Sequence, residues 1–387
     1  MLGYDGPARL SLQNAVSSSA TFPGKDHGRQ CLDILAIDPR NPSDKSVALL
    51  EKAVKADPQD AIAITRLAEI DETHGAYKQA AEHYEQGLRA SPKNVPLMAR
   101  LAALDYSFLK KTDDAFRLAS AAHNLDENDP LPSAVLGRIS YERGDCVYAE
   151  TALEKAVAAE NDPPAAWLAD LAKADYALGR PQDALDYMQR AAAKAGPGPF
   201  ADSCSQFLAL VKAGNSPASA KAAEPQAKSG LQRDPRDLPA LMVCGLAAEA
   251  AGDSTGASRY YEEAIASFPQ FPSALRQQAI LCANNLGDEP KALKLAEKAS
   301  PSYPGDPQLA CILGRGAYRR GDYARSAQLL QAASQRADDA QVFYYLGLDY
   351  SKLKRNAESK RALQKALALN LRPELAADAR RVLSELQ

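Results

Sequence analysis

Helix-stop signals recur along this chain about every 34 residues, and this recurrence constrains the possible folds more than any other feature. Proline cannot continue a helix, so each proline of the series marks the end of a helical segment. An Asp or Asn that follows shortly can cap the next helix, as at Asp60, Asn94 and Asp237. The prolines of the series are Pro58, Pro92, Pro130, Pro163, Pro197, Pro235, Pro269 and Pro304.

Two further series of residues follow the same period. One is the small residue that closes the second helix of each unit, at Gly87, Ala122, Ala156, Ala191, Gly230, Ala264, Ala299, Ala333 and Ala366. The other is a leucine followed by alanine or glycine near the middle of the first helix, at Leu67, Leu101, Leu136, Leu171, Leu208, Leu313 and Leu346. The three series predict pairs of amphipathic helices. Because a lone pair cannot bury its apolar face, neighbouring pairs must stack.

The repeated unit resembles the tetratricopeptide repeat, a helical hairpin with small, aromatic and proline residues at fixed positions. Residues 61–94 carry the pattern at Leu67, Ala68, Gly75, Tyr77, Ala80, Tyr84, Gly87 and Pro92. Residues 238–271 and 307–339 resemble it too, and the resemblance extends over residues 61–373. It implies an all-α, right-handed α-solenoid of about nine helical hairpins, of the kind found in bacterial-type multi-repeat scaffold proteins.

The first part of the chain fits the period poorly. Residues 1–25 are expected to be irregular or disordered. Residues 26–60 are expected to form a degenerate N-terminal capping repeat, because Pro39 and Pro58 leave room for one helix per stop and not for two. Four regular units should then follow over residues 61–198.

A second departure from the period lies further along the chain. Residues 199–237 are expected to be an irregular repeat and a hinge, with Pro225 shortening the second helix. Four more units are expected over 238–373, followed by a capping helix over 374–387. Terminal repeats need a polar outer cover, and one face of the capping helix should be apolar, through Leu375, Ala379, Val382 and Leu386.

Motifs that carry chemistry are absent from the sequence. The histidines lack metal-ligand spacing, and the chain has no phosphate-binding loop and no nucleophile elbow. We therefore expect no enzymatic activity, no cofactor and no bound metal. The net charge of −3 disfavours a nucleic-acid partner.

The sequence also bears on location. No segment approaches the ~20 apolar residues that a membrane span requires, and the first residues lack the features of a signal peptide. As written, the chain is expected to be cytoplasmic. The ragged residues 1–25 also resemble a truncation, and a missing upstream signal would instead favour a periplasmic or lipid-anchored protein.

In the family that the chain resembles, the first helices line a concave groove that holds protein or peptide partners. Tyrosines and charged residues at the matching positions would suit an extended peptide with acidic side chains or a C-terminal carboxylate. Alternatively, the tyrosines pack between adjacent helices as ordinary core residues. The candidate partner-binding residues are Glu69, Tyr106, Arg138, Tyr141, Lys173, Tyr176, Arg315, Tyr318, Arg319 and Lys352.

Two functions are consistent with this pattern. The first is a non-catalytic scaffold or adaptor, in an envelope assembly such as polysaccharide export, secretion or pilus biogenesis. The alternative is the substrate-recruiting region of a larger enzyme whose catalytic domain lies outside this sequence. The sequence does not identify the partner, the pathway or the oligomeric state.

Overall fold

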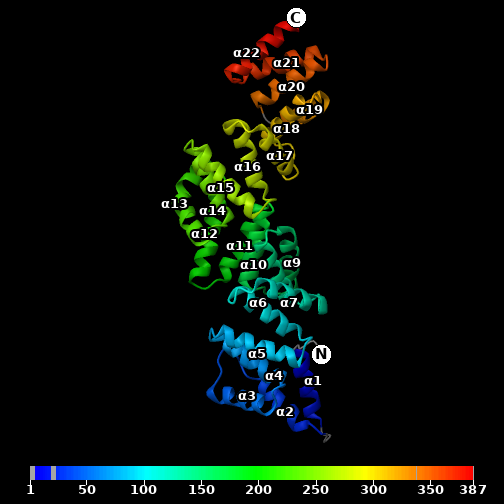
Figure 1. Ribbon diagram of the computed structural model, residues 1–387, viewed down its shortest axis with the longest axis vertical. Coiled ribbons are helices and arrows are strands. Elements are labelled where there is room, and N and C mark those ends of the chain that lie inside the picture. The colour runs from blue at the N-terminus through cyan, green and yellow to red at the C-terminus, as the bar shows by residue number, and fades with distance from the viewer. Residues whose placement is uncertain (1–4, 19–22, 337, 387) are drawn as a thin grey trace. The chain divides into compact units, whose positions relative to one another are not determined.

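The computed structural model describes residues 5–18, 23–336 and 338–386, and over these ranges the chain is helical and has no strand (Figure 1). The chain divides into two compact units, residues 1–174 and 175–387. The first unit contains α1 (Asp5–Ser17), α2 (Lys25–Leu35), α3 (Asp44–Ala56), α4 (Ala61–Thr73), α5 (Tyr77–Ala90), α6 (Val95–Ser107), α7 (Thr112–Leu125), α8 (Pro130–Glu142), α9 (Cys146–Ala159) and most of α10 (Ala165–Ala177).

The second unit begins within α10. Its further helices are α11 (Pro181–Lys194), α12 (Pro199–Ala213), α13 (Pro217–Arg233), α14 (Leu238–Ala250), α15 (Ser254–Ser267), α16 (Pro272–Leu281) with the π-helical turn η1 (Cys282–Leu286), α17 (Glu289–Ala299), α18 (Pro307–Arg319), α19 (Tyr323–Ser334), α20 (Ala340–Lys352), α21 (Asn356–Ala368) and α22 (Pro373–Glu385). In the part of the chain that the structure describes, nine helix pairs run from α4/α5 to α20/α21. The expected all-α solenoid of about nine hairpins is confirmed.

The helices begin at the caps that the sequence indicates. The Asp60 carboxylate accepts hydrogen bonds from the backbone N–H groups of Ile62 and Ala63, each at 3.1 Å. Asn94 accepts from the N–H of Leu97, also at 3.1 Å, and Asp237 caps α14 in the same way. These bonds satisfy N–H groups that have no partner inside the helix, which is why the boundaries follow the local sequence.

Small residues in the first helices allow the two helices of a hairpin to pack closely. In α8, a Cβ added at Gly137 would lie 2.6 Å from Leu153 Cγ of α9. In the second unit, a Cβ added at Gly347 of α20 would lie 2.6 Å from Leu363 Cγ of α21. The leucine–small pairs of the sequence therefore mark the points of closest helix approach.

The expectation that residues 1–25 are irregular is wrong for residues 5–17, which form α1; residues 1–4 and 19–22 lie outside the described part. Pro7 lies in the first turn of α1, where a proline removes no helical hydrogen bond. A Cβ added at Gly28 of α2 would lie 3.2 Å from Val16 Cγ2, so α1 packs directly on α2. No residue of α1 is fully buried, and an amphipathic pattern was therefore hard to read in the sequence.

The expectation that Pro225 shortens its helix is also wrong. Pro225 lies inside α13, which is continuous over 17 residues. A proline within a helix costs about 3 kcal/mol. Ala227 and Gly230, which follow Pro225 in α13, are buried, so packing offsets that local cost. The boundary between the two units lies inside α10, between Ala174 and Asp175, and not in residues 199–237.

At the C-terminal end, α22 covers the last hairpin. Ala379 and Val382 are buried against the cluster formed by α20 and α21, and Leu375 and Leu386 pack at its edge. Arg381 stays on the outer side, paired with Asp378 and Glu385. A helix thus lies where the capping helix was expected, and its outer face is polar.

Candidate protein-binding surface

All ten predicted binding residues lie on the first helices of their hairpins: α4, α6, α8, α10, α18 and α20. We call this side of a unit its first-helix surface. In the first unit it contains Glu69, Arg100, Tyr106, Arg138 and Lys173, and in the second unit Arg315, Tyr318, Arg319, Tyr345 and Lys352.

In α4, Glu69 is nearly buried, with 7% of the residue exposed. It forms an ion pair with Arg66 of the same helix, and its other carboxylate oxygen lies 3.3 Å from Arg100 Nη2 of α6. The second guanidinium nitrogen of Arg100 lies 3.7 Å from Glu72. Glu69 thus pairs with arginines of two successive hairpins, and its role in binding a partner stays a prediction.

A second set of contacts joins α6, α8 and α10. The guanidinium of Arg138 lies over the Tyr106 ring, 5.4 Å from its centroid, and Arg138 Nε lies 3.8 Å from Asp170 Oδ2. Burial raises the pKa of Tyr106 to about 12, so its hydroxyl stays protonated. Burial also raises the pKa of Asp170, an effect that Lys173 and Arg138 oppose. The structure therefore brings together three of the predicted residues, Tyr106, Arg138 and Lys173.

Tyr141 and Tyr176, two further candidate tyrosines, differ in burial. Tyr141 of α8 is half-buried. Tyr176 of α10 lies in the second unit and is buried, with its ring centroid 5.7 Å from that of Phe207 and 5.4 Å from that of Phe271. Tyr176 is a core residue of that unit. Its burial beside Phe207 of α12 and Phe271, the residue before α16, fits the alternative in which the tyrosines pack as core residues.

A basic and aromatic cluster lies on α18 and α20 of the second unit. The Arg315 guanidinium lies 5.6 Å from the centroid of the Tyr345 ring and forms an ion pair with Glu289 at the start of α17. Arg319, one turn further along α18, lies 3.7 Å from the same Glu289 carboxylate. The Arg315 side chain is 12% exposed and that of Arg319 is 61% exposed. Arg319 is thus the more accessible of the two.

Tyrosine rings pack beside the arginines of this cluster. The Tyr318 ring packs edge-on against Tyr345, with centroids 6.4 Å apart, and against Tyr323 at 5.3 Å. Burial raises the pKa of Tyr345, and the positive charges of Arg315, Arg319 and Arg372 oppose that rise. Arg372, just before α22, therefore belongs to the same electrostatic environment. Lys352, at the end of α20, is exposed.

One geometry recurs in both units. A residue late in one first helix contacts a residue near the middle of the next first helix, as in Glu69–Arg100, Arg138–Asp170 and Arg315–Tyr345. The sequence analysis found the first member of each pair and missed the second. Spacing by one repeat could have indicated Arg100, Asp170 and Tyr345, had neighbouring units been compared position by position.

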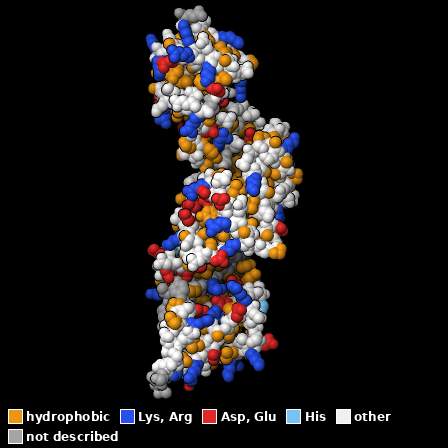
Figure 2. Space-filling model, turned by 180° about the vertical axis from the view of Figure 1, so that it is seen from behind, with side chains coloured by type: hydrophobic (Ala, Val, Ile, Leu, Met, Phe, Trp, Pro, Cys, Tyr) orange, Lys and Arg blue, Asp and Glu red, His pale blue; other side chains and the backbone are white. Residues whose placement is uncertain are grey.

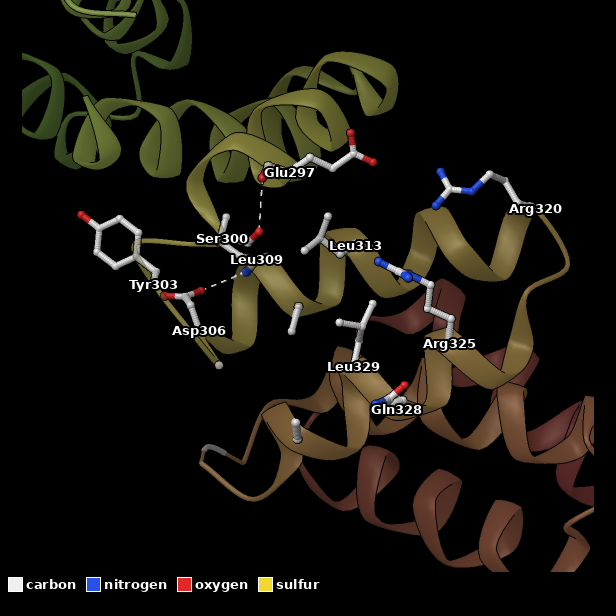
Figure 3. Close-up of a pocket in the computed structure, with 13 residues that line it drawn as sticks. Glu297, Ser300, Tyr303, Asp306, Leu309, Leu313, Arg320, Arg325, Gln328 and Leu329 are labelled. Atoms are coloured by element: carbon white, nitrogen blue, oxygen red, sulfur yellow. Dashed lines mark hydrogen bonds between the residues drawn. The ribbon is translucent and has the colours of Figure 1, made fainter. Parts of the chain in front are cut away.

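A separate pocket of about 650 Å³ lies on the second unit between α17, α18 and α19 (Figure 3). Leu309, Leu313 and Leu329 line it, and Arg320 and Arg325 stand at one end. None of the predicted binding residues lines this pocket. The sequence carried no signal for it, because its wall combines residues of three helices.

Stacked helical hairpins with a charged and aromatic first-helix surface define a helical-repeat protein of the interaction-scaffold class. Within that class, the profile of the tetratricopeptide repeat family matches residues 41–95, 135–199 and 244–307. These three segments of the chain are tetratricopeptide repeats. No curated protein sequence matches it.

Solved structures with a similar fold include three repeat proteins. The APC/C hetero-tetramer Cut9–Hcn1 is 13% identical with a TM-score of 0.47, over 100% of this chain and 93% of that one. The pilF protein of Pseudomonas aeruginosa is 16% identical with a TM-score of 0.36, over 71% and 98%. YrrB, described as a TPR protein with an unusual peptide-binding site, is 19% identical with a TM-score of 0.34, over 42% and 83%. At these identities the likeness concerns the fold alone.

Two further features of the described residues bear on other functions. No helix among them is both long and apolar enough to cross a membrane. Among the same residues, no group of three or more His, Cys, Asp and Glu side chains is placed to hold a metal ion. The repeats themselves support a protein-interaction scaffold in general.

Proposed function

We propose that this chain is a non-catalytic scaffold that binds a protein or peptide partner on the first-helix surface of its second unit. The partner segment carries carboxylate groups that pair with Arg319. The observation that carries the proposal is the cluster of Arg315, Arg319 and Arg372 around Tyr345. Within this cluster, the Glu289 carboxylate pairs with Arg315 and Arg319.

Three features of the cluster support a peptide ligand. Arg315 and Arg319 share the single carboxylate of Glu289, and Arg372 adds a third positive charge near Tyr345, so the cluster has an excess of positive charge. The Arg319 guanidinium is largely exposed and can form bidentate hydrogen bonds with a second carboxylate. Tyr318 and Tyr345 are rigid aromatic groups beside it, of the kind that give contact area at low entropic cost.

A protein partner fits the charge distribution better than a nucleic acid does. The net charge is −3, and Figure 2 shows Lys and Arg side chains interspersed with Asp and Glu over the face that it draws. A nucleic-acid surface would require a continuous basic stripe. We place the scaffold in a bacterial envelope assembly, such as polysaccharide export, secretion or pilus biogenesis. This setting is supported by the alanine-rich helices and by the segment 379–386.

The test begins with affinity capture from cells that express the protein, followed by mass spectrometry. A captured candidate is then purified, and its affinity for the wild type, for Arg319→Glu and for Lys294→Glu is measured by calorimetry. Lys294 is the matched control. It is an exposed lysine on α17, which is the second helix of its hairpin and therefore not part of the first-helix surface. Arg315 is unsuitable, since a glutamate there would face Glu289 in a poorly solvated position.

We expect Arg319→Glu to weaken binding about tenfold or more, because it replaces an attractive charge pair with a repulsive one. Lys294→Glu should leave the affinity unchanged within about twofold. Equal affinities for all three proteins would reject the Arg319 surface. Failure to recover any specific partner would reject the scaffold function itself.

A further inference from the structure

The first-helix surface of the first unit contains a charged pocket of about 480 Å³, distinct from the Arg319 cluster. Its wall is formed by α4, α6 and the turn after α2, and it contains both positively and negatively charged residues. Arg40, Arg66 and Arg100 contribute the positive charges, while Asp38, Glu69 and Glu72 contribute the negative charges. The pocket itself is therefore electrically balanced.

The buried member of this pocket is Arg66, which is only 8% exposed. One terminal nitrogen, Nη1, pairs with Glu69. The other, Nη2, lies 2.5 Å from Asp5 Oδ2 of α1, and 3.5 Å from the Leu35 carbonyl oxygen. The third nitrogen, Nε, has no hydrogen-bond partner among the described residues. A buried guanidinium has five N–H donors, and Glu69 alone satisfies few of them.

Asp5 thus supplies the second carboxylate that Arg66 requires, and it comes from outside the repeats. The helix that carries Asp5, α1, packs on α2 where the Val16 and Leu12 side chains lie over Gly28. Arg9 of α1 also donates a hydrogen bond to the Leu35 carbonyl oxygen. No residue of α1 is fully buried, and the Asp5 side chain is 47% exposed. A helix held by so little burial can leave its site at low cost.

We propose that Arg66 and its neighbours form a carboxylate-binding site for an acidic side chain of a partner peptide, and that α1 closes this site by placing Asp5 in it. Asp5 is then a tethered competitor, and a partner must displace α1 before its own aspartate or glutamate reaches Arg66. This inference rests on the proposed function in assigning peptide binding to a first-helix surface, but it concerns a different unit and different residues.

The energetics of a tethered competitor give the expected effect. An internal carboxylate on a short connection has an effective concentration in the millimolar range, so it occupies the site most of the time. The apparent affinity for an external ligand falls by the fraction of molecules in which the site is open. If that fraction is about one tenth, removing the Asp5 carboxylate raises the apparent affinity about tenfold.

The experiment uses the full chain and fluorescence anisotropy. One probe is a fluorescein-labelled glycine peptide with two internal aspartates and an amidated end. The other is a glycine–serine peptide of equal length whose only carboxylate is at its C-terminus, so that the two sources of carboxylate are separated. The proteins are wild type, Asp5→Ala, Asp5→Ala combined with Arg66→Met, and the control Asp26→Ala. Asp26 is an exposed aspartate of α2 that pairs with Arg29.

We expect Asp5→Ala to bind the aspartate peptide about tenfold more tightly than the wild type, and the added Arg66→Met to abolish that gain. Asp26→Ala should behave as the wild type, because it changes the same net charge without touching the pocket. Should Arg66→Met fail to fold, as judged by circular dichroism, the comparison of Asp5→Ala with Asp26→Ala decides alone.

Equal affinity of wild type and Asp5→Ala for the aspartate peptide would overturn the inference, and Asp5–Arg66 would then be a structural ion pair only. Preference for the C-terminal carboxylate probe would overturn the assignment to an acidic side chain. Neither result bears on the Arg319 surface. The two proposals therefore fail independently.

Discussion

The hydroxyl of Tyr84 donates a hydrogen bond of 2.6 Å to Glu72 Oε2, and Tyr84 is fully buried. Tyr84 lies on the second helix of its hairpin, Glu72 on the first, and Glu72 also faces Arg100 of the next hairpin. The same arrangement recurs in the second unit, where Tyr261 donates to Glu249 at 2.5 Å. A buried hydroxyl on one helix thus fixes a carboxylate that faces the neighbouring repeat.

Replacing Tyr84 with phenylalanine should lower the free energy of unfolding by about 1.5–3 kcal/mol, the usual worth of a hydrogen bond to a charged group. The ring still fills its site, but Glu72 loses its neutral donor. Urea and thermal unfolding, followed by circular dichroism, measure the change. Tyr148→Phe, at a tyrosine that is 43% exposed, is the control and should have little effect. Equal midpoints for both variants would show that this hydrogen bond contributes nothing.

Gly137→Ala should destabilise the first unit, although alanine favours a helix more than glycine does. The added Cβ would lie 2.6 Å from Leu153 Cγ and 3.0 Å from the Ala149 carbonyl oxygen, and the backbone cannot yield as a side chain can. Overpacking of this kind costs about 1–3 kcal/mol. Gly6→Ala in α1, where nothing lies within 4 Å of the added Cβ, should be neutral or stabilising. Comparison of the two melting temperatures separates packing from helix propensity.

Lys354→Gly should stabilise the second unit by about 0.5–1 kcal/mol. Lys354 has a φ of 59° in the turn between α20 and α21, whereas the turn after α18 carries Gly321 with a φ of 79°. A left-handed backbone strains a residue with a Cβ and not a glycine. Lys352→Gly, two residues earlier at the last residue of α20, should instead destabilise, by up to about 1 kcal/mol. The opposite signs are measured by thermal unfolding, and equal signs would exclude turn strain as the cause.

The raised pKa of Asp349 predicts how the free energy of unfolding depends on pH. It is fully buried in α20, and burial raises its pKa to about 7, while neighbouring Ser326 acts in the opposite direction. The ordinary pKa of an aspartate is about 3.9. Because the folded-state pKa is the higher one, the stability contributed by the protonated carboxyl group is complete below about pH 4. It is lost as the pH rises through about 7.

Asp349→Asn should therefore be more stable than the wild type above pH 7, by on the order of a few kcal/mol, and this advantage should shrink as the pH is lowered toward 5. The asparagine amide is neutral at every pH and so mimics the protonated acid. Parallel urea denaturation of both proteins between pH 5 and 8 measures the difference. A difference that stays constant over this range would contradict the assignment of a raised pKa to Asp349.

The sequence by itself predicted the repeat, the capped starts of helices such as α4 and α6, and the points of close helix approach. These features depend on local chemistry. Pro92 lies in the turn after α5, Asp60 and Asn94 cap the helices that follow them, and Gly137 has no side chain to keep two helices apart. Each signal acts within one hairpin, so a pattern with a fixed period is sufficient to recognise it.

Only the tertiary structure decided which candidate residues are accessible. Tyr106 and Tyr176 occupy equivalent places in their repeats, yet one lies beneath Arg138 and the other is buried between Phe207 and Phe271. Likewise, the accessible Arg319 could not be told in advance from the enclosed Arg315. Burial and ion pairing are set by residues one hairpin away. Their identity depends on how successive hairpins are aligned, which the sequence period does not specify.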